Sequence, residues 1–291
     1  MLWKYFRIAL NLLAIPPLCL GLVLINVLQM LSLLLLPFSG GAFRALNRLF
    51  ARSWFNAMTF VLERVLRVEF VGTGDTLPRK ENAFVVANHQ SQADIPALVA
   101  MASRCGRAGD LKWFVKDPLK WVPGVGWGML FLDCIFVKRN WSADKHKILA
   151  TFERLRRNKA PFWILSFAEG TRLTPIKLAR AQAYEARAGL PVSRFVMSPR
   201  TRGFEATLEG LGSLTDAVYD MTIAFEGFPV GCVPGLGALF FGPIERVHVH
   251  CARFPASSVP SSREGRVEWI LERFRVKDER LARFRETGSL A

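Results

Sequence analysis

Residues 83–94 read AFVVANHQSQAD, an apolar run that leads directly into a polar loop with one histidine and one aspartate. A short apolar run bounded by polar residues predicts a buried strand. Similar runs occur at 67–71, 112–115, 134–137, 162–167, 217–225 and 244–251. Amphipathic stretches predict helices at 93–103, 143–157 and 177–188 and a surface helix in the tail from residue 262. Strands alternating with helices predict an α/β domain with a mixed, largely parallel sheet flanked by helices. The last two strands have no clear helix between them, so we expect them to pair differently.

The chain as a whole is both apolar and basic. Its 291 residues are 51% hydrophobic, and 39 Lys and Arg face 24 Asp and Glu, which gives a net charge of +15. The apolar content excludes a disordered chain, and the lack of a heptad or glycine period excludes a coiled-coil or collagen-like fibre. Soluble nucleic-acid binders are seldom this apolar, and polytopic membrane proteins are seldom this charged. The combination therefore favours a protein that works at an anionic membrane surface.

The surplus of apolar residues lies at the N-terminus. Residues 8–36 carry no charge, and basic residues flank them on both sides. A bilayer core of about 30 Å takes about 20 helical residues, so the run is long enough to enter or cross a membrane. Pro16 and Pro17 are expected to break the helix into arms at 8–15 and 18–36. Because the flanks are symmetric, a hairpin and a single tilted span stay equally open.

Residues 43–68 alternate arginine with large apolar residues and predict an amphipathic helix. This helix lies either along the membrane interface or against the soluble domain. We therefore expect a membrane anchor and interfacial helix in residues 1–66 and a catalytic domain in residues 67–291, with no repeats and no second globular domain.

His89 is the histidine best placed for chemistry. It follows a predicted strand, and Asp94 comes five residues later. Catalytic groups collect at the carboxyl ends of strands in open α/β sheets. A carboxylate beside an imidazole fixes its tautomer and stabilises the imidazolium. His89 and Asp94 therefore predict a general base and the residue that orients it.

Several predicted turns carry cations suited to phosphate. Residues 166–172, SFAEGTR, combine Gly170, which permits a tight turn, with Arg172, whose guanidinium matches phosphate oxygens. The turn at 199–203 is also cationic, and Lys116 and the FVKR run at 136–139 add further cations. Each cluster taken alone is more often a solvated basic loop. Together they indicate a base that activates a hydroxyl while cations hold a phosphorylated substrate.

Other chemistries lack their residues. The chain has no GxSxG elbow, no GxxxxGK[ST] loop and no cluster of metal ligands. Its five cysteines, without a CxxC spacing, predict reduced thiols. Without a protein nucleophile, direct attack by a substrate hydroxyl on an activated acyl group is the natural mechanism.

Four blocks resemble those of the glycerolipid acyltransferases, the 1-acylglycerol-3-phosphate acyltransferase (PlsC-like) family. NHQSQAD at 88–94 resembles the NHxxxxD block, CIFVKR at 134–139 the second block, and FAEGTR at 167–172 the FPEGTR block. MSPRTRGF at 197–204 is similar to the fourth block of the lysocardiolipin acyltransferase-like branch. The resemblance covers roughly residues 68–228. Ala168 replaces the usual proline and Arg202 the branch's usual threonine, which removes no catalytic group but leaves substrate preference open.

The resemblance implies transfer of an acyl chain from acyl-CoA or acyl-carrier protein to the sn-2 hydroxyl of a lysophospholipid, most simply lysophosphatidic acid. It implies that His89 deprotonates this hydroxyl and Asp94 orients His89, with no metal and no cofactor besides the acyl donor. The residues expected to contact the glycerol phosphate or other anionic groups are Glu169, Gly170, Thr171, Arg172, Lys116, Arg139 and Arg200. The oxyanion donors are not identified, and the backbone at 124–126 is a candidate.

Two alternatives stay open: a remodelling enzyme that acts on lysophosphatidylglycerol or lysocardiolipin, and a non-catalytic lipid-binding protein. The expected location is a membrane, with the catalytic domain on the cytoplasmic face. Family distribution and the Arg- and Ala-rich composition favour a bacterial inner membrane.

Overall fold

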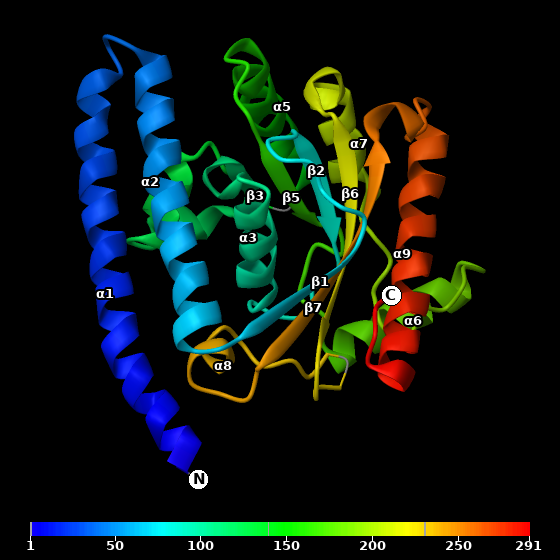
Figure 1. Ribbon diagram of the computed structural model, residues 1–291. Helices are drawn as coiled ribbons and strands as arrows, with labels where there is room; N and C mark the ends of the chain where they lie inside the picture. Colours follow the sequence, from blue (N-terminus) through cyan, green and yellow to red (C-terminus); the bar gives the residue numbers. More distant parts are fainter. Residues whose placement is uncertain (1, 139, 230) are drawn as a thin grey trace. The chain divides into compact units, whose positions relative to one another are not determined.

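A computed structural model describes the backbone of residues 2–138, 140–229 and 231–291 (Figure 1). Side chains are described in these ranges from Ala9 onward. The chain divides into two units. The first unit comprises Met1–Arg67, Pro78–Asn82 and Val99–Leu165, and the second comprises Val68–Leu77, Ala83–Leu98 and Ser166–Ala291. Helix α3 (Asp94–Arg104) and strand β5 (Trp163–Phe167) each run from one unit into the other.

The first unit begins with two long helices. α1 (Leu2–Ser32) and α2 (Gly40–Phe60) lie side by side and run in opposite directions, joined through the 3₁₀ turn Leu33–Leu35 (Figure 1). The indole N–H of Trp54 donates to the Leu18 carbonyl at 3.1 Å. The expected break at Pro16 and Pro17 is wrong, because α1 continues through both prolines. Each proline removes one backbone donor, whereas packing along α2 holds both halves of α1 in line.

α1 buries polar residues and exposes apolar ones. Asn26, Gln29 and Ser32 are 3%, 1% and 2% exposed. The outward residues include Leu12, Leu13, Leu20, Val23, Leu24, Val27, Met30 and Leu31. A helix that faces water places its polar residues outward and its apolar residues inward, so α1 has the opposite distribution. The stretch Ala9–Leu35 is long and apolar enough to cross a membrane.

The helix predicted at 43–68 packs on the folded part of the first unit. α2 continues as a π-helix at Val61–Val65. Arg48 forms an ion pair with Asp110, and the ring of Phe55 lies 5.7 Å from that of Trp113. Of the two interpretations left open by the sequence, these contacts favour packing on the protein.

The strands of the first unit are parallel. β3 (Leu111–Lys116) pairs with β4 (Ile135–Val137) and with the start of β5. A 3₁₀ helix (Asp117–Trp121) and the short α4 (Val125–Phe131) connect β3 to β4. α5 (Trp141–Arg157) follows β4 and buries Ile148, Phe152 and Leu155.

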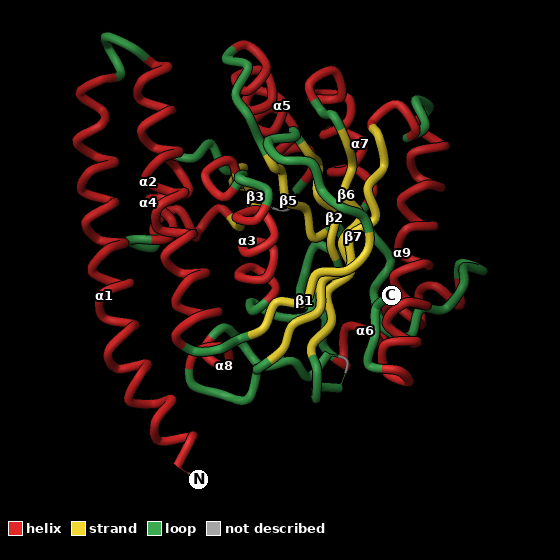
Figure 2. Tube along the Cα trace, in the orientation of Figure 1, coloured by secondary structure: helices red, strands yellow, loops and turns green. Residues whose placement is uncertain are grey.

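Four strands of the second unit lie side by side and appear as neighbouring yellow strands in Figure 2. Their order across the sheet is β1 (Glu69–Gly74), β7 (Arg246–Pro255), β6 (Ala217–Phe225) and β2 (Ala83–Ala87). β1–β7 and β2–β6 are parallel, and β6–β7 is antiparallel. The predicted mixed, largely parallel sheet and the different pairing of the last two strands are therefore confirmed. Every residue of β2 and β6 is buried, which explains why both sequences are mostly apolar. The exception in charge is Asp220 of β6, which is buried as the ion-pair partner of Lys277.

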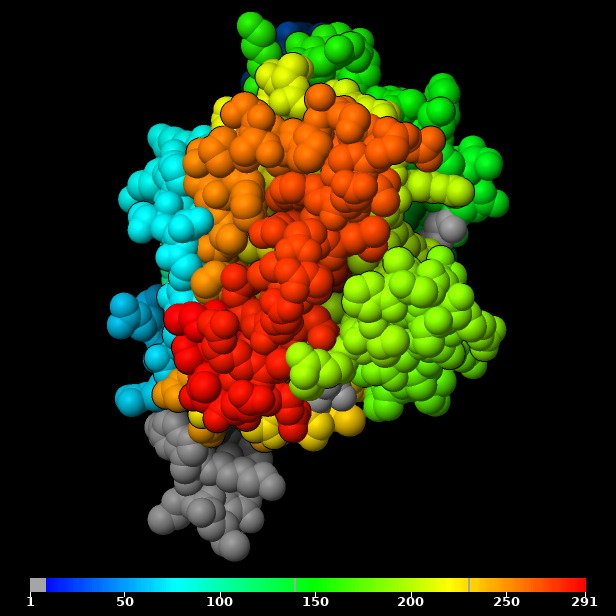
Figure 3. All heavy atoms as spheres, turned by 90° about the vertical axis from the view of Figure 1, so that its right-hand side faces the viewer, coloured from blue at the N-terminus to red at the C-terminus, as the bar shows by residue number. Residues whose placement is uncertain are grey.

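The helices of the second unit are α6 (Pro175–Arg187), α7 (Thr201–Leu211), the short α8 (Gly237–Phe240) and α9 (Arg263–Thr287). Figure 3 looks onto α9, whose atoms run down the face in orange and red. Ser262 caps α9 by accepting a bond from the Gly265 N–H at 3.1 Å. The sequence did not predict α7, whose Phe204 stacks on Phe84 at 5.5 Å in the core.

Candidate active site

The site begins where β2 ends. The side chain of Asn88 continues the pairing of β2 with β6: its Nδ2 donates to the Ile223 carbonyl at 3.0 Å, and its Oδ1 accepts from the Ile223 N–H at 2.8 Å. Asn88 is buried, so both bonds are shielded from water. This anchor fixes the backbone that presents His89 at the carboxyl end of the strand.

His89 and Asp94 are in direct contact, as the sequence predicts. His89 Nδ1 lies 2.7 Å from Asp94 Oδ2, which also accepts bonds from the N–H groups of Gln90 at 2.8 Å and Ser91 at 3.0 Å. Burial raises the pKa of Asp94, whereas the bonds from His89, Ser91 and Gln90 oppose this rise. With Asp94 ionised, its oxygen can only accept, so the tautomer that fits this contact carries its proton on Nδ1 and a lone pair on Nε2. This arrangement suits a general base.

The imidazole of His89 stacks on a neighbouring ring, and a hydrogen bond holds the His89 backbone. The rings of His89 and Phe167 stack with their centroids 3.9 Å apart and their planes at 14°. The His89 carbonyl accepts a bond from the Leu173 N–H at 2.7 Å. The His89 side chain is 16% exposed, so it is fixed but still accessible.

Glu169 faces the protein and not the solvent. It is 4% exposed, and its two carboxylate oxygens accept bonds from the N–H groups of His89 at 2.7 Å and Met197 at 3.2 Å. Burial raises the pKa of Glu169 to about 8, although these two amides and the ammonium of Lys277 oppose the rise. The sequence predicted that Glu169 helps to place the glycerol phosphate. Its geometry favours a different role, in which it positions the backbone of His89.

The third and fourth blocks are packed together. Gly170 has a φ of 71°, and its N–H closes a turn onto the Phe167 carbonyl at 2.9 Å. The N–H of Arg200 donates to the Ala168 carbonyl at 2.7 Å. A Cβ on Gly170 would lie 2.8 Å from Cδ and Nε of Arg200, so only glycine lets this guanidinium lie so close to the turn.

Two polar residues complete this turn. Arg172 is exposed, and the Thr171 hydroxyl accepts a bond from Lys177 Nζ at 2.7 Å. Lys177 also donates to the Arg172 carbonyl at 3.0 Å. Sequence reasoning missed Lys177, although its place in the first turn of the helix after the FAEGTR block was a readable signal.

Direct contacts thus connect five of the predicted site residues in the second unit, namely His89, Asp94, Glu169, Gly170 and Arg200. Lys116 is exposed at the end of β3 in the first unit. Arg139 lies outside the described residues. The roles of Lys116 and Arg139 in substrate binding therefore stay predictions.

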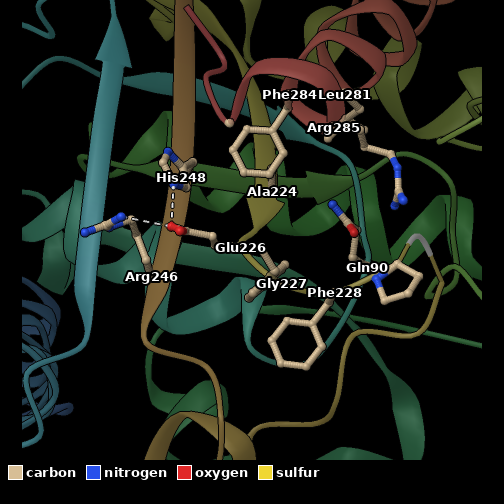
Figure 4. A pocket seen from close by; sticks show the side chains of 13 residues that line it. Gln90, Ala224, Glu226, Gly227, Phe228, Arg246, His248, Leu281, Phe284 and Arg285 are labelled. Atoms are coloured by element: carbon tan, nitrogen blue, oxygen red, sulfur yellow. Dashed lines mark hydrogen bonds and ion pairs between the residues drawn. The ribbon is translucent and has the colours of Figure 1, made fainter.

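A cavity of about 400 Å³ opens beside the His89 loop, and Gln90 lines it. Figure 4 shows Arg246 and His248 directed at Glu226, at 3.0 Å and 3.5 Å respectively. Phe228 and Phe284 form apolar parts of the wall. A cavity of this size with a mixed lining suits part of an amphiphilic molecule.

Among the described residues, no group of three or more His, Cys, Asp or Glu is arranged to hold a metal ion. The structure describes all five cysteines; none of them forms a disulfide, and Cys19 and Cys232 are exposed.

Comparisons with known proteins show which families the chain resembles. Residues 68–207 match the family model described as acyltransferase, and residues 238–291 match the model described as acyltransferase C-terminus. The chain is 34% identical to 1-acyl-sn-glycerol-3-phosphate acyltransferase 2 of Brassica oleracea over 89% of this chain and 66% of that protein. It therefore spans about two thirds of the length of such relatives.

Two animal relatives and one solved structure extend the comparison. The chain is 32% identical to the human 1-acyl-sn-glycerol-3-phosphate acyltransferase gamma, covering 89% of this chain and 69% of that protein. It is 34% identical to lysocardiolipin acyltransferase 1 of Danio rerio, over 93% of this chain and 70% of that protein. The crystal structure of the 1-acyl-sn-glycerophosphate acyltransferase PlsC from Thermotoga maritima shares the fold, with a TM-score of 0.55 and 19% sequence identity. The match covers 96% of this chain and 97% of the PlsC chain. The chain therefore belongs to the acyltransferase family that includes the 1-acyl-sn-glycerol-3-phosphate acyltransferases.

Proposed function

We propose that the protein transfers an acyl chain from acyl-CoA or acyl-carrier protein to the sn-2 hydroxyl of lysophosphatidic acid, which gives phosphatidic acid. The observation that carries this proposal is the 2.7 Å contact between His89 Nδ1 and Asp94 Oδ2, next to an exposed cationic turn. The plant and human relatives named as 1-acyl-sn-glycerol-3-phosphate acyltransferases support the choice of acceptor. The acyl donor is the proposed co-substrate, and no further cofactor is needed.

In the proposed mechanism, Nε2 of His89 removes the proton of the acceptor hydroxyl as its oxygen attacks the thioester carbonyl. The new imidazolium is stabilised by Asp94. Collapse of the tetrahedral intermediate breaks the C–S bond, and the leaving thiolate takes the proton back from His89. The products are the acylated lipid and the free thiol, and the enzyme returns to its starting state.

The anionic headgroup is assigned to the turn formed by the third and fourth blocks. Arg172 and Arg200 supply guanidinium groups and Thr171 a hydroxyl, and the close approach of Arg200 to Gly170 supports their joint action. Glu169 is assigned to positioning the His89 backbone. Lys116 and Arg139 remain proposed as further anion contacts.

Residues 1–66 are proposed as the membrane anchor and residues 67–291 as the catalytic domain. The outward apolar face of α1 supports this assignment, because the acceptor and the product are both lipids. We assign the catalytic domain to the cytoplasmic face. A bacterial inner membrane stays a prediction from composition.

A second acceptor is favoured by one observation. The lysocardiolipin acyltransferase 1 of Danio rerio is as similar to this chain, at 34% identity, as the Brassica oleracea relative. Acylation of lysocardiolipin or lysophosphatidylglycerol is therefore the alternative. A glycerophosphate group is common to all these acceptors, so the same turn serves either case.

The proposal is tested by incubating the purified protein with a panel of lysolipids and either acyl-CoA or acyl-carrier protein, and identifying the products by mass spectrometry. We expect phosphatidic acid to form fastest. The Arg172→Ala variant should raise the KM for lysophosphatidate more than the KM for the donor, whereas Arg180→Ala, an exposed arginine on α6, should change neither. Faster turnover of another lysolipid would shift the assignment, and no turnover of any lysolipid would refute it.

A further inference from the structure

The segment between β3 and β4 exposes an unusual amount of apolar surface. We call residues 117–131, which comprise the 3₁₀ helix and α4, the α4 segment. Its exposed large apolar side chains are Leu119 (43%), Trp121 (74%), Val122 (43%), Val125 (47%), Trp127 (38%) and Leu130 (50%). A contiguous exposed apolar patch on a folded unit indicates a contact with a membrane or another molecule.

The glycines of the α4 segment form its inner face, which packs on α1 and on the preceding turn. A Cβ on Gly124 would lie 3.1 Å from Leu22 Cδ2 of α1, and one on Gly128 would lie 3.7 Å from Gln29 Oε1. A Cβ on Gly126 would clash with the Leu119 carbonyl at 1.9 Å. The glycines therefore allow close packing against α1 and the preceding turn. Packing accounts for the glycines at 124–126, whose backbone the sequence suggested as oxyanion donors.

The α4 segment adjoins the part of α1 that has the character of a lipid-facing helix. The α1 residues that meet these glycines, Leu22 and Gln29, bracket Val23, Leu24 and Val27, which are 58%, 57% and 42% exposed. The polar Gln29 is turned inward to Gly128. The α4 segment therefore packs against the stretch of α1 that carries these exposed apolar side chains.

The charges around the segment match an anionic surface. Lys120 Nζ lies 5.3 Å from the centroid of the Trp121 ring and 2.9 Å from Asp117 Oδ2. Lys116 and Lys138 are exposed at the ends of β3 and β4, which are paired neighbours. Tryptophan with lysine is the pairing that membrane–water interfaces favour, since the indole enters the headgroup layer and the ammonium meets lipid phosphates.

We propose that the α4 segment is a second membrane contact, whose outer face enters the boundary between headgroups and acyl chains of an anionic phospholipid leaflet. Trp121, Val125 and Leu130 insert, while Lys116 and Lys120 meet the headgroups. A helix of seven residues spans about 10 Å, so it lies in the interface and does not cross the membrane. The inference rests on the proposed function in one respect, namely that α1 lies in a membrane.

Depth-dependent quenching tests the contact. The full-length protein with Cys19→Ser and Cys232→Ser, which removes the exposed thiols, receives one cysteine in place of Trp121 or Val125 and is labelled with an environment-sensitive fluorophore. Leu24→Cys on α1 is the control for membrane entry, and Glu153→Cys on α5, which is 55% exposed, is the control for a water-facing site. The variants are reconstituted in vesicles of phosphatidylcholine and phosphatidylglycerol with and without acyl-chain doxyl lipids.

We expect quenching by doxyl lipid at positions 24, 121 and 125 and none at position 153. Quenching at position 24 without quenching at positions 121 and 125 overturns the second contact and leaves the α1 anchor in place. No quenching at position 24 refutes membrane entry by α1, and with it this part of the proposed function. Protection of position 121 by acyl-carrier protein in the absence of vesicles would replace the lipid contact with a protein contact.

A kinetic comparison gives a second readout. Trp121→Glu with Leu130→Glu should lower kcat/KM for acceptor embedded in vesicles by about fivefold or more, because two charges replace inserted apolar groups. The same variant should leave kcat/KM for a detergent-dispersed short-chain acceptor unchanged. The matched change Leu149→Glu, at an exposed leucine of α5, should affect neither value. Equal losses with both acceptors would contradict the proposal.

Discussion

Glu169 holds the backbone of His89: its Oε1 accepts a hydrogen bond from the His89 N–H at 2.7 Å, in a position that is 4% exposed. Its Oε2 accepts from the Met197 N–H at 3.2 Å. One buried carboxyl group thus joins the loop of the proposed base to the block that carries Arg200. The position of the proposed base depends on this carboxyl group, which does not itself need to touch the substrate.

The pH dependence of stability reports on Glu169. Burial raises its pKa in the folded protein to about 8, from the usual 4.5. Between these pH values the folded state holds a proton that the unfolded state has lost, so this group makes stability fall as pH rises from about 4.5 to about 8, with a slope of at most ~1.4 kcal/mol per pH unit. Glu169→Gln does not titrate and should lack this part of the slope.

Urea unfolding in detergent at pH 5, 6.5, 8 and 9 measures this slope. Glu209→Gln, at an exposed glutamate of α7, serves as the control and should keep the wild-type slope. Identical slopes for wild type and Glu169→Gln would show that the carboxylate titrates as if it were exposed.

The contact between Gly170 and Arg200 predicts a binding defect. In Gly170→Ala the new methyl group would lie 2.8 Å from Arg200 Cδ, so the guanidinium must move. We expect the KM for lysophosphatidate to rise about tenfold, which corresponds to the loss of one charge-assisted hydrogen bond, and the KM for the donor to change little.

Gly189→Ala provides a matched control. Gly189 also has a positive φ, 66°, but nothing lies within 4 Å of its added Cβ. Both variants carry the backbone strain, and only Gly170→Ala displaces Arg200. Steady-state kinetics that show the same KM in both variants would contradict a role for Arg200 in acceptor binding.

The C-terminal helix supports the fourth block through Asp278. Its Oδ1 accepts bonds from the N–H groups of Arg194 at 2.8 Å, Phe195 at 2.6 Å and Val196 at 3.3 Å, directly before Met197. Asp278→Ala leaves these amides without an acceptor, which should cost about 2–3 kcal/mol and loosen the segment that leads to Arg200.

Hydrogen exchange of residues 194–197, read together with the KM for the acceptor, tests this support. Faster exchange and a raised KM are expected for Asp278→Ala. Glu279→Gln, at the exposed neighbouring residue, should match the wild type in both. Unchanged exchange at these amides in Asp278→Ala would refute the supporting role of α9.

The elements that the sequence predicts best are those whose information is local. The bounds of β2 and β6 are exact because both strands are predominantly apolar segments between turns. The His89–Asp94 contact was predictable because the two residues are five positions apart and flank one turn. The continuous α1 was not, since packing along α2 outweighs the local effect of Pro16 and Pro17.

Long-range contacts explain the rest of what the sequence did not reveal. Glu169 receives its bonds from residues 80 and 28 positions away, so its motif indicated a charged turn and not a buried support. α7 was missed because it begins inside a cationic block that reads as a turn. Its Phe204 belongs to the core because it stacks on Phe84 and Trp269, which are far from it in the sequence.

The proposed acyl transfer depends most directly on His89 as the general base. The decisive measurement is the acyl-transfer rate of His89→Ala with lysophosphatidic acid at saturating acyl donor, with membrane binding and thermal stability measured on the same preparation. We predict that kcat falls by about 10²–10⁴-fold, the usual contribution of a general base, while membrane binding and stability match the wild type. Turnover near the wild-type rate in a folded, membrane-bound His89→Ala protein would contradict the account.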